Sequence, residues 1–285
     1  MPRNLADKTV ALIESATAIL QGSQPATVRG GCYQLFTRRL IPDMAKSSTD
    51  RVSRALTAAR ERGLIPWDWI VDETREVEHR QGWDDPEAYM ATVWRAYRKD
   101  RWTDQPARVM VVSEKRTVGG VLRPVIHAYG VPFGVYHGFG SATALNDLAA
   151  RSVADRRPLT ILYVGDHDPS GRAMSDADIP TRLARYGGEA TIARLAVTPE
   201  QVAGYGLPTF SAHDKAKDAR YRWFLERHGE VCCELDALDP TLLRATVEDA
   251  IRQQLDLGRW ERADAIEAVE LASLRDFFRS WPGAA

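Results

Sequence analysis

The sequence predicts an α/β protein with a helical N-terminal domain, a mostly parallel α/β domain and a helical C-terminal tail. Three short helical patterns precede residue 63, apolar segments of strand length alternate with helical ones after Pro106, and helical patterns return after Leu235. These observations place the domains at residues 1–104, 105–240 and 241–285. A chain of 285 residues can bury the cores of two or three domains.

The composition is typical of a protein of the reducing cytoplasm. The cysteines Cys32, Cys232 and Cys233 lack the spacing of zinc ligands and leave an odd thiol in any pairing. Charges interrupt the apolar positions at the N-terminus, so neither a signal peptide nor a membrane span is predicted. We therefore expect a cytoplasmic protein without a membrane partner.

The N-terminal domain is predicted to contain a helix-turn-helix of the winged-helix type. Helical spacing marks three segments, residues 5–20, 28–40 and 49–62. Thr27 has the position of an N-cap for the second of them. Segment 67–72 alternates apolar and polar residues, as expected for a half-buried strand that forms the wing. A helix near 86–97 is expected to end the domain.

A basic stretch runs through this domain, although the net charge of the whole chain is −1. It holds eight cations against three acids, an excess of five positive charges: Arg29, Arg38, Arg39, Lys46, Arg51, Arg54, Arg60 and Arg62. We expect the last seven to contact the phosphates of double-stranded DNA. Little sequence preference is expected, because the third helix has no Asn or Gln to bind adenine edges. The alternative is a solvated, Arg-rich helical face.

Four apolar segments predict the strands of a mostly parallel sheet, residues 109–113, 131–136, 159–164 and 190–197. The stretches between them are long enough for helical crossovers. In the tail, apolar residues recur at helical intervals in residues 245–255 and 262–278.

Carboxylates follow two of the predicted strands. Glu114 comes directly after the first strand, and Asp166 and Asp168 follow the third. Since parallel strands end at a common edge, the three acids predict a site for Mg²⁺, for which Mn²⁺ can substitute, of the kind used in phosphoester chemistry. The alternative is that Asp168 or Ser170 only caps the following helix and Asp166 forms a solvated turn.

Two other motifs compete for these residues. The segment from Asp166 begins like a calcium loop, but Ala177 occupies the twelfth position, where glutamate is required. Gly138-Phe139-Gly140 follows a strand like a dinucleotide fingerprint, but the third glycine is lacking. The calcium interpretation is rejected, and the dinucleotide one is weak.

Strand-end Glu114, the turn Gly138-Phe139-Gly140 and the motif Asp166-x-Asp168-Pro-x-Gly171 together resemble the TOPRIM domain of topoisomerases, primases and related nucleases. This resemblance implies that the α/β domain is of TOPRIM type. It also implies that Glu114, Asp166 and Asp168 bind magnesium.

Within that family the chain is most similar to the DNA-cleaving A subunits of topoisomerase VI, the type IIB topoisomerase, and to their meiotic relatives. The likeness runs from about Thr27 to Leu238 and includes Val28-Arg29-Gly30-Gly31-Cys32-Tyr33, Ser113-Glu114-Lys115 and Glu234-Leu235-Asp236-Ala237-Leu238. It implies that Tyr33 is the catalytic nucleophile, with Arg29 and Glu114 beside it in the reaction. A homodimer is implied, in which each tyrosine works beside the partner's carboxylates. Strand passage would need a separate ATPase subunit.

The tyrosine also has a physical rationale. Arg29 lies one helical turn before Tyr33, so its guanidinium can hold a phosphate that the phenol attacks. The alternative is that Tyr33 packs as a core aromatic with Leu35, Phe36 and Leu40. Gly30-Gly31 would loosen this helix, since each glycine costs about 0.5–1 kcal/mol relative to alanine.

Three functions follow from these observations. The first is magnesium-dependent DNA cleavage by tyrosine transesterification, as in a compact stand-alone form of the topoisomerase subunit. The second is a hydrolytic TOPRIM nuclease of a mobile element or defence system. The third is a winged-helix protein that binds DNA without cutting it.

Overall fold

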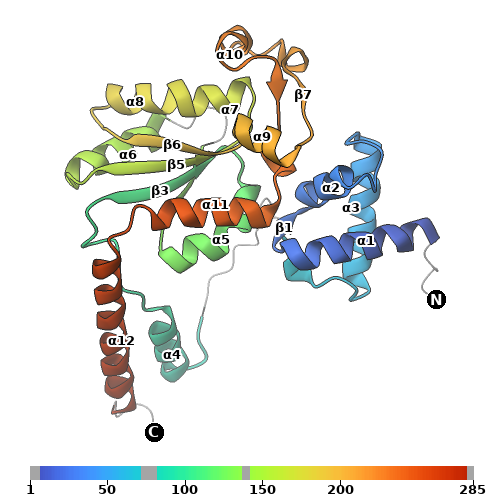
Figure 1. The fold of residues 1–285 in the computed structure, drawn as a ribbon. Coiled ribbons are helices and arrows are strands. Elements are labelled where there is room, and N and C mark those ends of the chain that lie inside the picture. Colours follow the sequence, from blue (N-terminus) through green and yellow to red (C-terminus); the bar gives the residue numbers. More distant parts are fainter. Residues whose placement is uncertain (1–6, 72–81, 137–141, 281–285) are drawn as a thin grey trace.

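A four-stranded parallel sheet with the order β4-β3-β5-β6 forms the centre of the computed structural model, which describes residues 7–71, 82–136 and 142–280 (Figure 1). Its strands are β3 (Arg108–Ser113), β4 (Phe133–Val135), β5 (Leu159–Val164) and β6 (Thr191–Ala196). Every residue of β5 is buried, because both faces of the sheet are covered. The predicted mostly parallel sheet is confirmed.

Helices cover both faces of the sheet. On one face α5 (Thr117–Tyr129) packs against α11 (Pro240–Arg252). On the other, α6 (Ala142–Ala154) packs against α8 (Ile179–Arg185), and short α7 (Pro169–Ala173) leads into a π-helical turn at Met174–Asp178. The carboxyl ends of β3 and β5 point toward α7 and the N-terminal helices (Figure 1).

The N-terminal helical unit consists of three helices around a core of its own, as predicted. They are α1 (Asp7–Ser23), α2 (Val28–Thr37) and α3 (Lys46–Glu61). The predicted N-cap is confirmed, since Thr27 Oγ1 accepts a hydrogen bond of 2.9 Å from the N–H of Gly30. Helix α2 ends earlier than predicted, and Arg39 adopts a left-handed backbone with φ of 59°.

The strand predicted for residues 67–72 is wrong over most of its length. Trp67–Trp69 forms a 3-10 turn after Pro66, and only Ile70–Val71 is a strand, β2. It pairs in parallel with β1 (Ala26–Thr27), whereas a wing is built from an antiparallel hairpin. Residue 72 lies outside the described residues, and the winged-helix assignment stays a prediction.

Strand β2 also docks the helical unit onto α5. A Cβ on Gly120 would lie 2.6 Å from Cγ2 of Val71, so only glycine allows this close approach. The helical unit is therefore fixed beside the carboxyl end of the sheet.

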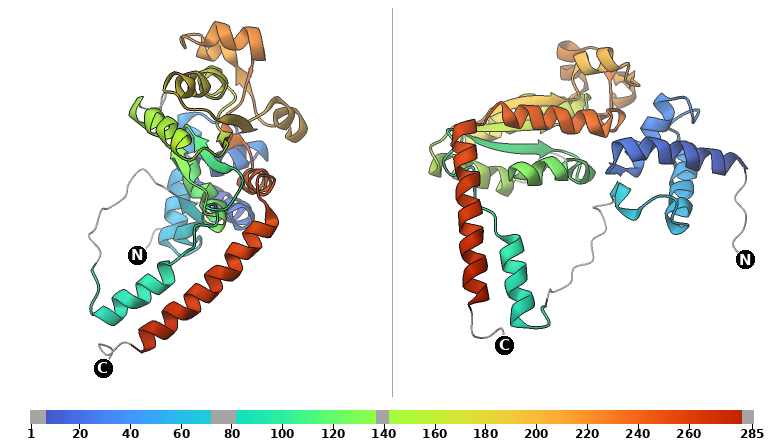
Figure 2. Two further views of the ribbon diagram at one scale, coloured as in Figure 1. Left: turned by 90° about the vertical axis from the view of Figure 1, so that its left-hand side faces the viewer. Right: turned by 60° about the horizontal axis from the view of Figure 1, so that its bottom comes forward.

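Helices α4 (Pro86–Ala96) and α12 (Leu257–Arg279) form a pair that extends from the opposite end of the sheet (Figure 2). Ion pairs hold the segment after α4 to α12, with Lys99 Nζ at 3.0 Å from Glu270 and an Arg101 nitrogen at 3.2 Å from Glu267. The helix expected near 86–97 thus packs on the tail. Within the described parts of the chain, no helix is long and apolar enough to cross a membrane.

A small lobe follows β6 and α9 (Pro199–Tyr205). It comprises β7 (Phe210–Ser211), a 3-10 turn at Ala212–Lys215, α10 (Tyr221–His228) and β8 (Val231–Cys232), which pairs antiparallel with β7. We call residues 210–232 the β7–β8 lobe. Backbone hydrogen bonds of 2.8 and 2.9 Å between His167 and Cys233 connect its end to the loop after β5. No local pattern in the sequence predicted this lobe.

Candidate active site

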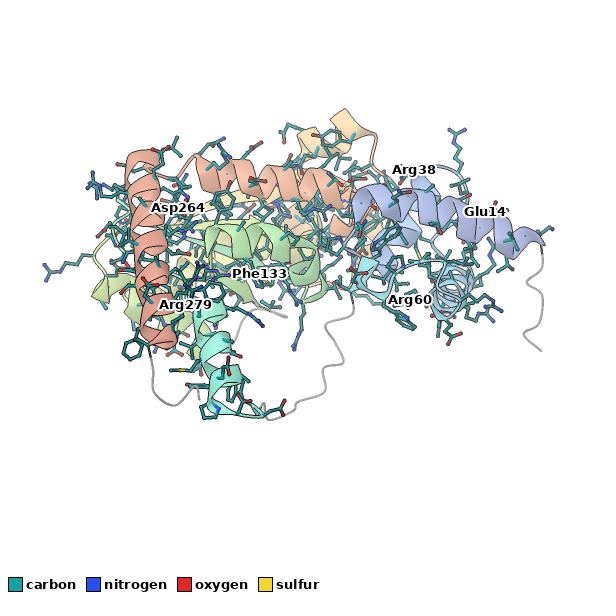
Figure 3. All side chains as sticks on the ribbon, turned by 90° about the horizontal axis from the view of Figure 1, so that it is seen from below. Glu14, Arg38, Arg60, Phe133, Asp264 and Arg279 are labelled. Carbon is teal, nitrogen blue, oxygen red and sulfur yellow. The ribbon has the colours of Figure 1, made fainter. Side chains whose placement is uncertain are left out.

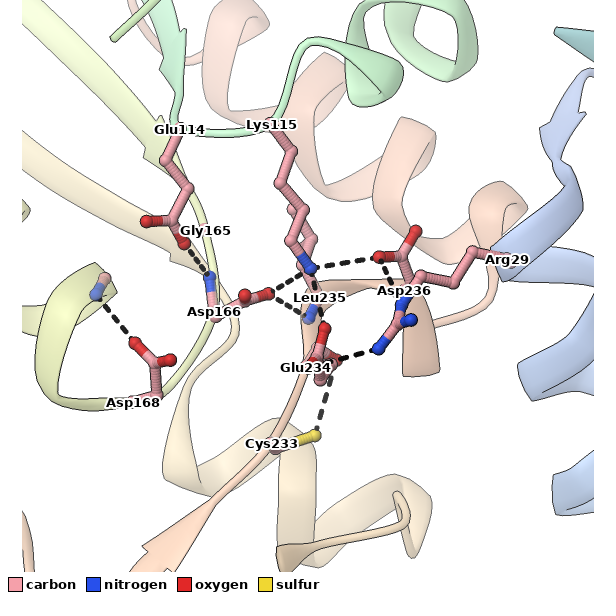
Figure 4. Close-up of polar contacts among 12 residues, drawn as sticks. Arg29, Glu114, Lys115, Gly165, Asp166, Asp168, Cys233, Glu234, Leu235 and Asp236 are labelled. Atoms are coloured by element: carbon pink, nitrogen blue, oxygen red, sulfur yellow. Dashed lines mark hydrogen bonds and ion pairs between the residues drawn. The ribbon is translucent and has the colours of Figure 1, made fainter. Parts of the chain in front are cut away.

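The three predicted carboxylates lie at one edge of the sheet (Figure 4). Ser113 pairs with Val164, so the residues that follow β3 and β5 emerge side by side. Glu114 Oε1 accepts a hydrogen bond of 3.1 Å from the N–H of Asp166. Asp166 and Asp168 are only 8% and 5% exposed.

The turn after β5 is compact because of Gly171. A Cβ at this position would lie 2.2 Å from the carbonyl oxygen of Asp166 and 3.1 Å from Glu114 Oε1. Asp168 caps α7, its Oδ1 accepting a hydrogen bond of 2.8 Å from the N–H of Gly171. The capping alternative therefore describes part of what Asp168 does, but Asp166 is buried and forms no solvated turn.

The side chain of Arg194 holds this turn in place by hydrogen bonds to the backbone of the turn. Its buried guanidinium donates to the carbonyl oxygens of Gly165 and Gly171 at 3.0 Å each, and also to that of Asp166. It further donates to Ser175 Oγ at 2.9 Å. Burial lowers the pKa of Arg194, and carbonyl oxygens in place of carboxylates accept the hydrogen bonds of its guanidinium.

Lys115 supplies a cation directly at the carboxylates. Its Nζ lies 2.7 Å from Asp166 Oδ1, 2.9 Å from Glu234 Oε2 and 3.0 Å from Asp236 Oδ2. Asp166 Oδ1 also accepts a hydrogen bond of 2.7 Å from the N–H of Leu235. Burial raises the pKa of Asp166, and Lys115 opposes that rise.

Arg29 extends this network to α2, the helix of Tyr33. Its guanidinium lies 3.3 Å from Glu234 Oε1 and 3.8 Å from Asp236 Oδ2. The same group lies 5.6 Å from the centre of the Tyr33 ring. A continuous chain of charges, Arg29 to Glu234 and Asp236 to Lys115 to Asp166, therefore joins α2 to the carboxylate edge of the same protomer (Figure 4).

Tyr33 is buried beside this chain of charges. It is 7% exposed and belongs to the core under the sheet, whereas Leu35 belongs to the core of the helical unit and Leu40 is exposed. Burial, followed by the charge of Glu234, raises the pKa of Tyr33 to about 12. The phenol is a protonated core aromatic here, and of the three predicted partners only Phe36 packs against the same core.

The donor chemistry of the edge suits a hard divalent cation, since carboxylate oxygens are the ligands that Mg²⁺ and Mn²⁺ prefer. Burial and the neighbouring Asp166 raise the pKa of Glu114 to about 7, and a cation would relieve that cost. Two lysines already contact these carboxylates. Lys115 contacts Asp166, and Lys215 Nζ lies 3.3 Å from Asp168 Oδ2. Among the described residues no group of three His, Cys, Asp or Glu side chains is arranged to hold a metal ion. A metal bound through Asp166 or Asp168 would therefore compete with the lysine that contacts that carboxylate.

The predicted DNA contacts lie mainly on the surface of the helical unit. Exposed members of the set are Arg38, Arg39, Lys46, Arg51, Arg54 and Arg62. Arg60 is half-buried, with its guanidinium 4.8 Å from the centre of the Trp67 ring. Figure 3 shows Arg38 and Arg60 on this unit, well away from the α4–α12 pair that carries Asp264 and Arg279.

Four residues of the site were not predicted from the sequence: Lys115, Arg194, Glu234 and Asp236. Glu234 and Asp236 stood in a motif that resembles the topoisomerase subunit, which was the available signal. Arg194 interrupts the predicted apolar strand 190–197, and a charge in such a strand marks a buried polar contact. The turn Gly138-Phe139-Gly140 lies outside the described residues.

The chain matches no model of a known protein family. A search of curated proteins also finds no matching sequence.

Proposed function

We propose that the chain cleaves double-stranded DNA in a magnesium-dependent reaction in which Tyr33 attacks the phosphodiester. One observation carries the proposal: ion pairs link Arg29, on the helix of Tyr33, to Asp166 at the carboxylate edge. A nucleophile, a phosphate-binding guanidinium and a set of carboxylates are the parts that such a reaction needs, and they lie in one network.

The roles of the residues follow from their chemistry. Tyr33 Oη forms a bond to phosphorus, the bond from phosphorus to a deoxyribose oxygen breaks, the phenol loses its proton and the leaving oxygen gains one. Arg29 neutralises the charge that develops on the phosphate. Glu114, Asp166 and Asp168 would hold Mg²⁺, which stabilises negative charge on the phosphate oxygens when bound.

Tyr33 must become accessible before it can act, because only 7% of it is exposed. Negative phosphates compete with Glu234 and Asp236 for Arg29, so DNA that binds at this edge would weaken the link that holds α2. In this proposal DNA itself frees Tyr33. A separate ATPase subunit and a homodimer, both implied by the resemblance, belong to the same proposal. The ion pairs that carry it, however, join Arg29 to the carboxylates of its own chain and not to those of a partner.

The burial of Tyr33 favours a second candidate, a hydrolytic nuclease in which water attacks the phosphodiester and Tyr33 is structural. A pKa of about 12 makes the phenol a poor nucleophile as it stands. The same three carboxylates would hold the metal in both candidates.

Cleavage products distinguish the two. Supercoiled DNA is incubated with the chain and Mg²⁺, denatured and examined for protein attached to DNA ends. Transesterification predicts a covalent adduct that is lost in Tyr33→Phe and in Asp166→Ala but kept in Tyr205→Phe, an exposed tyrosine on α9. Hydrolysis predicts free ends, unchanged in Tyr33→Phe and lost in Asp166→Ala. Intact DNA under all conditions would refute both.

A further inference from the structure

The β7–β8 lobe brings a short basic segment next to the carboxylates. Residues 215–222 hold four cations against one acid, Lys215, Lys217, Arg220 and Arg222 against Asp218. Lys217 and Arg222 are exposed, and Arg220 pairs with Asp218 at 3.0 Å. The predicted DNA contacts of the helical unit did not include this segment.

Lys215 is the member of the segment that reaches the site. Its Nζ lies 3.3 Å from Asp168 Oδ2, and the same atom lies 5.7 Å from the centre of the Phe210 ring. The Lys215 side chain is 41% exposed, whereas that of Asp168 is 6% exposed. The ammonium group therefore stands between a buried carboxylate and the solvent from which a substrate would arrive.

Lys115 and Lys215 are held very differently. Lys115 contacts three acids, two of which remain if Asp166 is taken by a metal ion. Lys215 makes a single ion pair among the described residues, to Asp168. A divalent cation on Asp168 would leave the ammonium of Lys215 without its carboxylate, yet still anchored by the 3-10 turn at Ala212–Lys215.

We propose that Lys215 contacts the phosphate of DNA that lies on the carboxylates, and that residues 215–222 bind the adjoining backbone. The inference rests on the proposed function, because it needs DNA at this edge. It adds a phosphate-binding element at the carboxylate edge, supplied by the lobe and not by the helical unit (Figure 1). A lysine ammonium is a point charge that suits a phosphate oxygen.

A structural role for Lys215, as a partner that stabilises Asp168, predicts a different pattern. Binding to DNA would then be the same with and without the lysine. The proposed role predicts that the contribution of Lys215 to DNA binding depends on metal. Without metal, Lys215 stays paired with Asp168. With metal on Asp168, the lysine is free to contact a phosphate.

The experiment measures binding of a fluorescent duplex by anisotropy, in Mg²⁺ and in EDTA, over a series of salt concentrations. In Mg²⁺ we expect Lys215→Ala to weaken binding about tenfold and to reduce the salt slope by about 0.9, the value for one phosphate contact. In EDTA the loss should be about twofold or less, and Lys215→Arg should restore most of the affinity. Lys217→Ala, on the same segment but without an ion pair to Asp168, is the control for metal dependence and should lose the same amount in Mg²⁺ as in EDTA.

An unchanged affinity of Lys215→Ala in Mg²⁺, or an equal loss in Mg²⁺ and EDTA, would overturn the inference. If wild type forms the adduct in these conditions, the proposed function survives that result. If wild type neither binds nor cuts DNA, both proposals are refuted together.

Discussion

The cations of the carboxylate edge and those of α3 belong to two different kinds of surface. Lys115 and Arg194 are largely enclosed and make several contacts each, to acids in one case and carbonyl oxygens in the other. Arg51 and Arg54 are exposed on α3. The four residues look alike in the sequence, since all are basic. They differ in solvent exposure and in the number of groups that contact them.

The enclosed cations stabilise the site, whereas the exposed cations are available to bind DNA. Removing an enclosed cation leaves its buried partners without a counter-charge, so the fold loses stability. Removing an exposed cation changes stability little, but it removes a charge that a polyanion can use. The edge should therefore respond to mutation through stability and metal binding, and α3 through the salt dependence of DNA binding.

The largest effect is expected at Lys115. Lys115→Met would leave Asp166, Glu234 and Asp236 facing one another, and we expect the free energy of unfolding to fall by about 3–5 kcal/mol. Chemical denaturation measures the change. Lys217→Met, at an exposed position of the lobe, is the control and should stay within about 0.5 kcal/mol of wild type. A Lys115→Met variant as stable as that control would show that the enclosed cation is no more important for stability than an exposed one.

Glu114 gives the edge a pH dependence. Its folded pKa is raised from 4.5 to about 7, so the folded state keeps a proton that the unfolded state has lost. Without metal, the Glu114 contribution to stability should therefore fall as pH rises from about 4.5 to 7, by about 3 kcal/mol at most. Mg²⁺, which would replace the proton, should reduce this fall.

Urea denaturation between pH 5 and pH 8 tests this. Glu114→Gln should gain stability relative to wild type as pH rises, while Glu261→Gln, at an exposed position on α12, should follow wild type. Parallel curves for wild type and Glu114→Gln would mean that Glu114 is not held at a raised pKa.

The smallest effect on the fold is expected on α3. Replacing Arg51 and Arg54 by alanine should leave stability within about 0.5 kcal/mol for each change. If both contact phosphates, the salt slope of DNA binding should drop by about 1.8. Isotherms at several salt concentrations measure this slope, and an unchanged slope would remove α3 from the DNA-binding surface.

Local patterns predicted most of the fold, since its signals lie close together in the sequence. Thr27 caps α2, and β5 has its predicted bounds, because capping geometry and an apolar run of six residues are local properties. The strand predicted for residues 67–72 was wrong over most of its length, because alternation over a few residues does not distinguish a strand from the 3-10 turn that begins after Pro66.

The site was predictable only in part for a similar reason. Glu114, Asp166 and Asp168 follow strands, and the parallel register alone brings them together. Lys115 and Glu234 are 119 residues apart, and nothing local indicates that they meet. Their contact depends on how the segment after β8 folds back onto the sheet edge.

The central claim is that Glu114, Asp166 and Asp168 form one magnesium centre. The most direct measurement is the thermal unfolding midpoint of wild type and Asp166→Asn, with and without Mg²⁺, with Asp249→Asn on the exposed face of α11 as control. At a hundredfold excess of Mg²⁺ over its Kd, wild type and Asp249→Asn should gain about 5 °C. Asp166→Asn should gain nothing, yet match wild type without metal, because Asn keeps the acceptor for Leu235 and Lys115 keeps Glu234 and Asp236. No response of wild type to Mg²⁺, together with a loss of metal-free stability in Asp166→Asn, would contradict the claim and leave the carboxylates a structural role.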